Sequence, residues 1–470
     1  MDGWEAIIGL ECHVQLDTRT KLFCACPQPS STDAPHNTLI CSFCAGLGGA
    51  PTPSGEAIGL ALRAALALGC EIRAESRFER KAYSNPDLPK GYQITQQRRP
   101  IAGGGRLRFD GGQLALRGLH LEEDAGRRAG ETLDLNRAGA ALIEVVSEPD
   151  LRDPEAASEA ARMLRRVLMS AGVTRGEMAE GHLRFDANVS VRRVGEAPGQ
   201  WVELKNLNSF RAIRRSARAE IARQIALIEG GGAVEPETRA WDGKATRRTR
   251  RRLAGADYDF QPEPNLPAVR PDAAALAAAG VDLNAPLDAW LLARDRAARA
   301  RWRADYGLDD ETIAVIGGDP EAAAFFQAAV AAGGPPGDTA AWLRGEVTRG
   351  LAEASGRLAD CALTPDALAG LVAMVSAGRL PRAAGRRVLA ALMARGGDPE
   401  VLAAGMAPVA DEAALLEIVA AAVAGHPEAA ARYRAGRTNV LGFFVGVVLK
   451  ETRGRADPGV TRRLLENALG

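Results

Sequence analysis

The sequence predicts an α+β protein in which a mostly antiparallel sheet domain is followed by helical domains. Short β-type runs separated by turns fill the first part of the chain, and strand signals nearly vanish after about residue 285. The chain has 470 residues, whereas a single core stops growing at roughly 250–300 residues. We therefore expect three domains, a sheet domain at 1–290, a helical domain at 291–405 and a small helical tail domain at 406–470.

The sheet domain alternates predicted strands with a few helices. Gly55 opens an apolar helical pattern at 55–70, and Asp153 followed by Pro154 is an N-cap signal for a helix at 154–171. Another helix is expected at 209–228, where Gly230, Gly231 and Gly232 stop it. The strand-like runs are 4–16, 106–124, 140–148, 182–194 and 201–208. The later helical segments are 289–307, 320–333, 341–356 and 367–378.

The composition is that of an ordinary globular protein. Hydrophobic residues make up 46% and charged residues 25%, and 59 basic residues balance 59 acidic ones. This balance argues against a histone-like cationic binder, although a local basic stripe is enough to bind nucleic acid. The sequence has no apolar run long enough for a membrane span and no basic segment typical of a signal peptide near its start. We expect a cytoplasmic protein that does not enter a membrane.

Four of the seven cysteines form a pattern. Cys24 and Cys26 are followed after 14 residues by Cys41 and Cys44. Two close pairs of thiolates fit a structural zinc knuckle at 24–44, because zinc binds four soft ligands in a tetrahedron. The first pair has one intervening residue where zinc ribbons usually have two or more. Four unrelated buried thiols, or a redox pair, are the alternatives.

Acidic residues gather in the strand-like segments. Glu11 and His13 alternate along one strand and therefore point to the same face. Acids on one face of a sheet repel each other unless a cation compensates them, and oxygen ligands with one histidine suit Mg²⁺ or Mn²⁺. A set of solvated carboxylates is the alternative. The other members of this set are His120, Glu122, Glu123, Asp124, Glu144, Glu148, Asp186 and Glu203.

Two basic segments could contact phosphate. Lys90 lies beside a glycine in the proline-containing loop 86–96, and an arginine run occupies 237–253. No P-loop motif is present. Each segment could equally be a solvated surface loop.

Long motifs of this chain resemble one known family. IGLECHVQL, RKAYSNPDLPKGYQITQ, LHLEEDAGR, LNRAGAALIEVVSEPDLRDPEAA, RFDANVSVRR, VELKNLNSFRAI, ETRAWD and PEPNLP occur in that family's order and spacing. The chain is similar to the GatB-type subunit of the tRNA-dependent aspartyl/glutamyl amidotransferase. The resemblance covers the whole chain, including a C-terminal segment similar to that family's tail domain.

The resemblance implies a fold and a reaction. The first domain would be similar to the catalytic fold of glutamine synthetase. The family uses ATP and Mg²⁺ to phosphorylate the side-chain carboxylate of mischarged Glu-tRNA(Gln) or Asp-tRNA(Asn). Ammonia, released from glutamine by an amidase (glutaminase) subunit, then displaces the phosphate. A third, small subunit would complete a heterotrimer.

Carried over by position, the resemblance assigns roles to individual residues. The implied magnesium ligands are Glu11, His13 and Glu123, with Glu122, Asp186 and Glu203 as second choices. Lys90 and Arg80 would contact phosphate, and Asp186 and Glu203 belong to the cofactor site. The implied catalytic set is Glu11, His13, Lys90, Glu122 and Glu123. The helical and tail domains would bind tRNA, the tail through Lys450, Arg453 and Arg455.

The chain departs from the family pattern at several positions. They are Ser84, Asn85, Leu135, Ala141, Phe185, Asp259 and Gln261. Ordinary sequence drift explains them if the function is the usual one. The alternatives are a paralogue that activates a different carboxylate, on tRNA or another carrier, and a tRNA-binding scaffold without catalysis. The persistence of Glu11, His13, Glu122, Glu123 and Lys90 argues against the scaffold.

Overall fold

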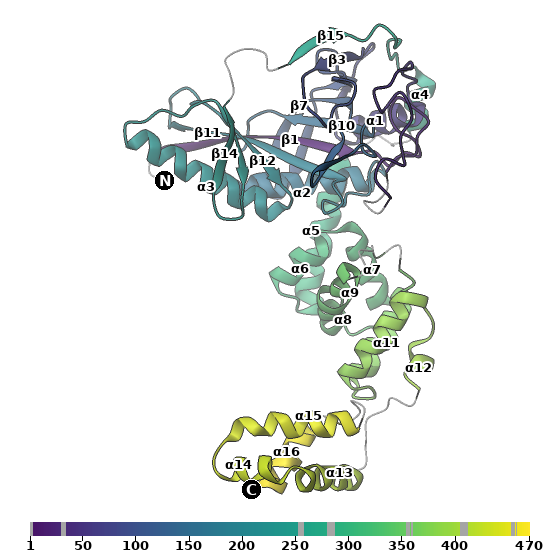
Figure 1. The fold of residues 1–470 in the computed structure, drawn as a ribbon, viewed down its shortest axis with the longest axis vertical. Coiled ribbons are helices and arrows are strands. Elements are labelled where there is room, and N and C mark those ends of the chain that lie inside the picture. The colour runs from purple at the N-terminus through teal and green to yellow at the C-terminus, as the bar shows by residue number, and fades with distance from the viewer. Residues whose placement is uncertain are drawn as a thin grey trace. The chain divides into compact units, whose positions relative to one another are not determined.

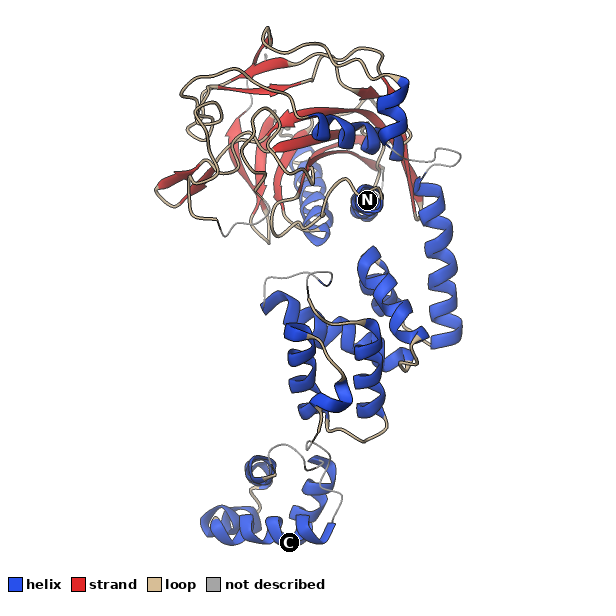
Figure 2. Cartoon of the chain, turned by 90° about the vertical axis from the view of Figure 1, so that its right-hand side faces the viewer, coloured by secondary structure: helices blue, strands red, loops and turns tan. Residues whose placement is uncertain are grey.

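The structure is a computed structural model that describes residues 3–29, 34–251, 258–279, 287–353, 358, 361–404, 412–452, 456 and 458–470. Its contacts divide the chain into two compact units, Met1–Arg296 and Ala297–Gly470. Every strand of the described residues lies in the first unit, and the second unit is helical (Figures 1 and 2). The predicted α+β class, a sheet domain followed by helical regions, is confirmed.

The first unit contains fifteen strands, four whole helices and the first half of a fifth among the described residues. The strands are β1 (Trp4–Gln15), β2 (Glu71–Ile72), β3 (Glu79–Ala82), β4 (Tyr92–Thr95), β5 (Ala102–Gly103), β6 (Arg106–Phe109), β7 (Gly112–Glu123), β8 (Arg127–Ala129), β9 (Thr132–Asp134), β10 (Ala141–Ser147), β11 (Leu183–Arg193), β12 (Val202–Leu207), β13 (Glu237–Trp241), β14 (Thr246–Arg251) and β15 (Asp259–Pro262). The helices are α1 (Gly55–Ala67), α2 (Pro154–Ser170), α3 (Phe210–Glu229), α4 (Ala273–Ala279) and α5 (Leu287–Tyr306), which continues into the second unit.

A ten-stranded sheet organises this unit. Its order is β14-β13-β12-β11-β1-β10-β7-β5-β2, with β6 paired to β7. All neighbours are antiparallel except β12 and β13, which are parallel. The long strands β1, β7, β10 and β11 are central, so their side chains determine the two faces of the sheet.

One face of the sheet is the core, and the opposite face is polar. Cys12 and Val14 of β1 and Ala187 of β11 are fully buried, whereas the alternate residues Glu11 and His13 are only half-buried. Figure 1 shows α2 and α3 on one side of the sheet and β3 and β15 on the other. The period of two along each strand therefore places the acidic residues on the face opposite these helices.

The helices α1, α2 and α3 begin within one residue of where the sequence predicts. Ser54, Asp153 and Ser209 cap α1, α2 and α3 by accepting a hydrogen bond from a backbone N–H of the first turn. Gly230 is the C-cap of α3. These caps confirm the helices expected at 55–70, 154–171 and 209–228, with ends that shift by one to three residues.

Two smaller sheets complete the unit. The strands β15, β3 and β4 form a three-stranded antiparallel sheet, and β8 pairs with β9. Lys81 of β3 reaches Glu122 of β7, so the three-stranded sheet covers part of the polar face. The arginine run, for which a surface loop was one reading, forms the strand pair β13–β14 over its described part.

The second unit holds two separate apolar cores. One is built from Trp302, Phe326, Trp342 and their neighbours, and the other from Leu415, Phe444, Leu465 and theirs. The elements around the first are α6 (Asp310–Gly317), α7 (Pro320–Ala331), α8 (Pro336–Trp342), the π-helical turn η1 (Leu343–Val347), α9 (Thr348–Glu353), α10 (Pro365–Ser376), α11 (Arg382–Arg395) and α12 (Pro399–Leu402). Those around the second are α13 (Glu412–Gly425), α14 (Pro427–Arg434), the 3₁₀ turn η3 (Thr438–Val440), α15 (Leu441–Glu451) and α16 (Pro458–Leu469).

Among the residues that the structure describes, none of the helices has both the length and the apolar character that crossing a membrane requires.

Candidate functional site

Strand pairing brings charged residues of four strands together on the polar face. His13 of β1 lies opposite Glu144 of β10, which in turn lies opposite His120 of β7. On the other side of β1, Glu11 lies opposite Asp186 of β11. Residues that lie directly opposite each other in antiparallel strands share a face, so these five side chains lie on one face of the sheet, in two adjacent rows.

These five side chains line a pocket of about 300 Å³. Glu203 and Lys205 of β12 line its wall from the same sheet, and Lys81 and Tyr258 line it from the region of the three-stranded sheet. The pocket therefore lies between the polar face and the segments that cover it. Of the predicted site residues, Glu11, His13, Asp186 and Glu203 line it.

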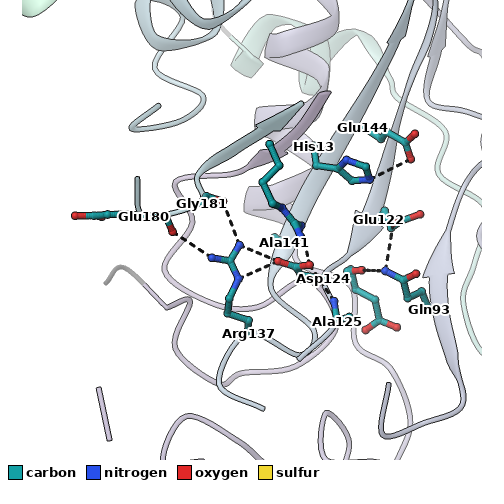
Figure 3. Close-up of polar contacts among 12 residues, drawn as sticks. His13, Gln93, Glu122, Asp124, Ala125, Arg137, Ala141, Glu144, Glu180 and Gly181 are labelled. Atoms are coloured by element: carbon teal, nitrogen blue, oxygen red, sulfur yellow. Dashed lines mark hydrogen bonds and ion pairs between the residues drawn. The ribbon is translucent and has the colours of Figure 1, made fainter. Parts of the chain in front are cut away.

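Three side chains are close enough to share a cation. The ligand atoms of His13, Glu122 and Glu144 all lie within 4.8 Å of one another. The His13 Nε2 to Glu144 Oε2 distance is 3.8 Å, and His120 Nε2 lies 3.1 Å from the same oxygen. Glu122 is held by Gln93, whose Nε2 donates to Oε1 at 3.2 Å (Figure 3). One histidine and two carboxylates form a hard ligand set that suits Mg²⁺ or Mn²⁺.

The pKa values on this face reflect strong electrostatic coupling. Burial raises the pKa of Glu11, and the nearby charges of Glu144, Glu203 and Asp186 raise it further against a hydrogen bond from Asn188. Burial also opposes ionisation of Glu144, but the charges of His120 and His13 outweigh it and hold the Glu144 pKa well below its usual range. The raised pKa of Glu11 therefore reflects burial first and repulsion among carboxylates second, and a bound cation would relieve that repulsion.

Asp186 and Glu203 share a lysine. Lys205 Nζ lies 2.9 Å from Asp186 Oδ2 and 3.3 Å from Glu203 Oε1. Burial lowers the pKa of Lys205, but the two carboxylates raise it by more, so the net shift is upward. These two predicted cofactor residues are thus partly neutralised by a cation from their own sheet.

The predicted set of Glu11, His13 and Glu123 is not brought together. Glu123 follows Glu122 on β7 and therefore points to the opposite face. Both of its carboxylate oxygens accept hydrogen bonds from Lys90 Nζ at 2.5 Å, and Ile94 N–H donates to Oε1 at 2.8 Å. Arg80 is likewise engaged, because its Nε donates to Glu263 at 2.6 Å. The roles implied for Glu123, Lys90 and Arg80 stay predictions.

The Lys90–Glu123 pair is buried, so its disruption should cost stability. The side chains are 7% and 2% exposed. Glu123→Gln leaves the Lys90 ammonium without a counter-charge, and we expect a loss of about 3–5 kcal/mol in the free energy of unfolding. Urea denaturation measures it. The double variant Lys90→Met/Glu123→Gln should recover part of the loss; a stable single variant would contradict the dependence of Lys90 on Glu123.

Asp124 is the centre of a second buried network. Arg137 Nη2 donates to Asp124 Oδ2 at 2.8 Å and Arg184 Nη2 donates to Oδ1 at 2.8 Å. Arg137 also donates to the backbone oxygens of Glu180 and Gly181 (Figure 3). Arg184 lies opposite His13 in the β1–β11 pairing. The network therefore links the end of β7 to β11, next to His13 of the three side chains that could share a cation.

Asp124 should make stability depend on pH in the acid range. Burial raises its pKa, but the charges of Arg184 and Arg137 lower it more, to about 2 from an ordinary value of 3.8. A depressed pKa adds stability that is fully present above pH ~4 and is lost as the pH falls toward ~2, a contribution of about 2 kcal/mol. Urea denaturation between pH 5 and pH 2.5 should show a smaller acid loss for Asp124→Asn than for the parent chain.

The control for Asp124 is an exposed ion pair. Asp17 lies 3.0 Å from Arg175, and both side chains are well exposed. Asp17→Asn should change stability by less than about 1 kcal/mol, because surface pairs contribute little. Equal acid loss in the parent chain and in Asp124→Asn would contradict the assignment.

The four predicted cysteines lie together in one cluster that could hold a metal ion. The Sγ atoms of Cys24, Cys26, Cys41 and Cys44 are within 4.8 Å of one another. The Cys44 Sγ lies 3.8 Å from that of Cys41 and 3.9 Å from that of Cys26. A tetrahedral zinc with Zn–S bonds of about 2.3 Å separates its sulfurs by about 3.8 Å. A disulfide would need about 2.05 Å.

A buried lysine contacts this cluster. Lys21 has no exposed surface, and its Nζ donates to Ala138 O at 2.7 Å and to Cys44 Sγ at 3.6 Å. A hydrogen bond from Cys24 lowers the pKa of Cys44 to about 4 against the effect of burial, and the charge of Lys21 acts in the same direction. The surroundings therefore favour a thiolate at Cys44, which is the form that binds metals.

The sequence analysis did not single out two lysines of the pocket. It also did not select two residues of the acidic set as metal ligands. Lys81 and Lys205 line the pocket without having been singled out. His120 and Glu144 belonged to the acidic set, but the resemblance pointed to Glu123 instead. The alternation of side chains along a strand could have separated Glu122 from Glu123, whereas the proximity of Glu144 to His13 depends on the pairing of β1 with β10.

The departures from the family pattern fall in different surroundings. Asp259 and Gln261 lie on β15, which pairs with β3, and Ser84 and Asn85 follow β3. Four of the departures thus lie on or beside the sheet that covers the pocket. Phe185 is buried in the core, 1% exposed, on the face opposite the pocket.

Arg453 and Arg455 of the tail lie outside the described residues, and Lys450 is exposed in the last turn of α15.

Comparison with known proteins identifies the class to which this sheet domain and its pocket belong. Residues 6–277 match the GatB/GatE catalytic domain, and residues 324–469 match the GatB domain. The chain therefore belongs to the GatB family and is an amidotransferase subunit of that type.

Relatives from three bacteria match over nearly their full lengths. Each is the B subunit of an aspartyl/glutamyl-tRNA(Asn/Gln) amidotransferase. The protein of Anaeromyxobacter sp. strain K is 41% identical, over 100% of this chain and 99% of its own. That of Thermosynechococcus vestitus is 40% identical over 99% and 96%, and that of Solidesulfovibrio magneticus 38% over 100% of both.

Proposed function

We propose that this chain phosphorylates the side-chain carboxylate of mischarged Glu-tRNA(Gln) or Asp-tRNA(Asn) with ATP and then converts it to the amide. The pocket that contains His13, Glu144 and Glu11 carries this proposal, together with the full-length similarity to subunits of that name. Similarity at about 40% identity over both domains favours the usual function over a paralogue or a scaffold.

The reaction has two steps. A carboxylate oxygen of the substrate attacks the γ-phosphorus of ATP, and the bond to the β-phosphate oxygen breaks to release ADP. Ammonia then attacks the carbonyl carbon of the acyl phosphate, the C–O bond to phosphorus breaks, and the departing phosphate takes up the proton that nitrogen loses. The first step brings two anions together, and the second expels an anionic phosphate, so the site must supply positive charge.

We assign Mg²⁺ to His13, Glu122 and Glu144, with Glu11 beside them. Bound there, Mg²⁺ would neutralise phosphate charge and orient the transferring group. His120 holds Glu144, and Gln93 holds Glu122, so the ligands are fixed before substrate binds. Lys81 and Lys205 add positive charge at the pocket walls.

We assign structural zinc to Cys24, Cys26, Cys41 and Cys44. Four thiolates complete the tetrahedron and leave no position for water, so this metal would stabilise the fold and take no part in the chemistry. Phe43 places its ring 4.5 Å from Lys90 Nζ, so the knuckle borders the buried Lys90–Glu123 pair.

The proposal extends to the domains of the chain, its partners and its location in the cell. We propose a catalytic domain at 1–290, a helical domain at 291–405 and a tail domain at 406–470, supported by the two separate cores of the second unit. The helical and tail domains would bind tRNA, the tail through residues that include Lys450. A separate amidase subunit would supply ammonia, a third, small subunit would complete the complex, and a tRNA substrate implies the cytoplasm.

Release of ADP from the purified chain tests the proposal. The reaction contains Mg-ATP and ammonium, which replaces the amidase, and the acceptors are Glu-tRNA(Gln), Asp-tRNA(Asn), uncharged tRNA and free glutamate. We expect release that depends on one of the charged tRNAs. Absence of release with all four, from folded and zinc-loaded chain that also carries its partner subunits, would favour the paralogue or the scaffold.

A further inference from the structure

Trp201 is an exposed aromatic side chain at the edge of the polar pocket. It is 42% exposed and lines the pocket. Of the large apolar side chains that are exposed in the described residues, Trp201 alone lines this pocket. A large exposed aromatic group on a polar face is informative, because burial is the usual state of such side chains.

The alternation along β12 explains where Trp201 lies. Trp201 directly precedes β12, and Trp201, Glu203 and Lys205 all line the pocket, whereas Val202 and Leu204 have no exposed surface. The position of Trp201 is therefore fixed by the strand. Along the strand, Trp201 and Lys205 are about 13 Å apart at roughly 3.3 Å per residue, so Trp201 forms the outer end of this wall.

The charges around Trp201 restrict what it can bind. The nearest pocket residue on its own strand is Glu203, and Asp186 lies beyond it next to Lys205. Lys205 carries one positive charge against these two carboxylates, so a net negative charge remains that disfavours phosphate. Carboxylate oxygens also accept hydrogen bonds from amino and hydroxyl groups. This end of the pocket therefore favours an uncharged aromatic ring that carries donor groups, such as a nucleobase with its ribose.

We infer that Trp201 is a stacking platform for an adenine base. This inference rests on the proposed function, which provides two sources of adenine, ATP and the 3′-terminal adenosine of the charged tRNA. Base stacking on an aromatic side chain is worth enough to change affinity by about 5- to 100-fold.

The test is equilibrium binding by the full-length chain. The probes are Mg-ATP, tripolyphosphate, and tRNA with and without its terminal adenosine. The variants are Trp201→Phe, which keeps an aromatic face, and Trp201→Leu, which removes it. Trp241→Leu is the matched control, because Trp241 is a half-buried tryptophan on β13 that packs against the core.

We expect Trp201→Leu to weaken ATP binding by about 5- to 100-fold while tripolyphosphate binding stays unchanged. The ATP affinity of Trp201→Phe should stay near that of the parent chain. Weakening confined to tRNA that carries the terminal adenosine would instead identify the RNA as the source of the base. Unchanged affinity for both adenine ligands, or equal weakening of tripolyphosphate, would overturn the inference.

The two proposals fail in different ways. If the parent chain binds an adenine ligand through Trp201 but releases no ADP with any acceptor, the proposed function fails and the stacking role stands. If ADP release is normal and Trp201→Leu binds every ligand as the parent does, only the stacking role fails.

Discussion

Replacing Glu122 by glutamine is expected to reduce ATP-dependent amidation by at least about 100-fold, because it removes one negative ligand of the proposed magnesium site. Gln93 can still donate to the new side-chain oxygen, as it does to Glu122 at 3.2 Å. Lys81 loses the counter-charge of Glu122 but keeps that of Glu144, so the fold should persist. The measurements are ADP release and the binding of Mn²⁺ in place of Mg²⁺. Both should weaken, whereas the urea midpoint should stay close to that of the parent.

Glu71→Gln is the matched control for this experiment. Glu71 is an exposed glutamate on β2, at the edge of the same sheet, and does not line the pocket. The control should retain full ADP release and Mn²⁺ affinity. Normal Mn²⁺ binding by Glu122→Gln would remove Glu122 from the ligand set. Glu11 and Asp186 would then be the next candidate ligands.

Replacing Cys44 by serine is expected to abolish zinc binding and to unfold the knuckle. Cys44 lies within 4 Å of the sulfurs of Cys26 and Cys41, and it accepts a hydrogen bond from the buried Lys21. Structural zinc in small domains contributes on the order of 10 kcal/mol of binding free energy, which is folding free energy for the segment it holds. Metal analysis, thermal unfolding and protease cleavage within 20–50 measure the loss.

Cys361→Ser tests whether the effect is specific to the cluster. Cys361 is a half-buried thiol of the second unit that donates to Leu358 O at 3.2 Å. The Cys361→Ser variant should have the same zinc content as the parent chain. A parent chain without zinc, purified without chelators, would refute the zinc assignment.

Local signals in the sequence predicted the helices well. Asp153 was predicted as an N-cap and Gly230 as part of a helix stop, and both cap helices through contacts with residues close in the sequence. The N-caps Ser54 and Ser209 were not predicted as caps, although they act in the same local way. The cysteine cluster was predicted for a similar reason. Two close pairs on turns can meet without any information about the remote parts of the chain.

The site was predicted only in part, because strand pairing is a long-range property. Alternation places Glu11 and His13 on one face, and this prediction is confirmed. The same rule separates Glu122 from Glu123, but the resemblance favoured Glu123. Glu144 reaches His13 only because β1 pairs with β10 in a particular register, and a shift of one residue would turn it to the core.

The groups that long basic side chains contact also could not be predicted from the sequence. Lys90 and Arg80 were predicted to contact phosphate, yet each contacts a carboxylate from a distant segment, Glu123 and Glu263. The arginine run at 237–253 has a composition unlike that of a typical strand. It still forms β13 and β14, and acidic residues form ion pairs with three of its arginines, Arg247 with Asp242, Arg248 with Glu237 and Arg251 with Glu235.

The edge strands of the large sheet affect whether this protein aggregates at high concentration. An edge strand offers unpaired backbone groups to any passing chain, and exposed charge is a common protection against such pairing. The strand β14 ends one edge and exposes Arg247, Arg248, Arg250 and Arg251, while β2 ends the other and is only two residues long. Arginines at this edge should therefore keep the sheet from growing into aggregates, whatever else they bind.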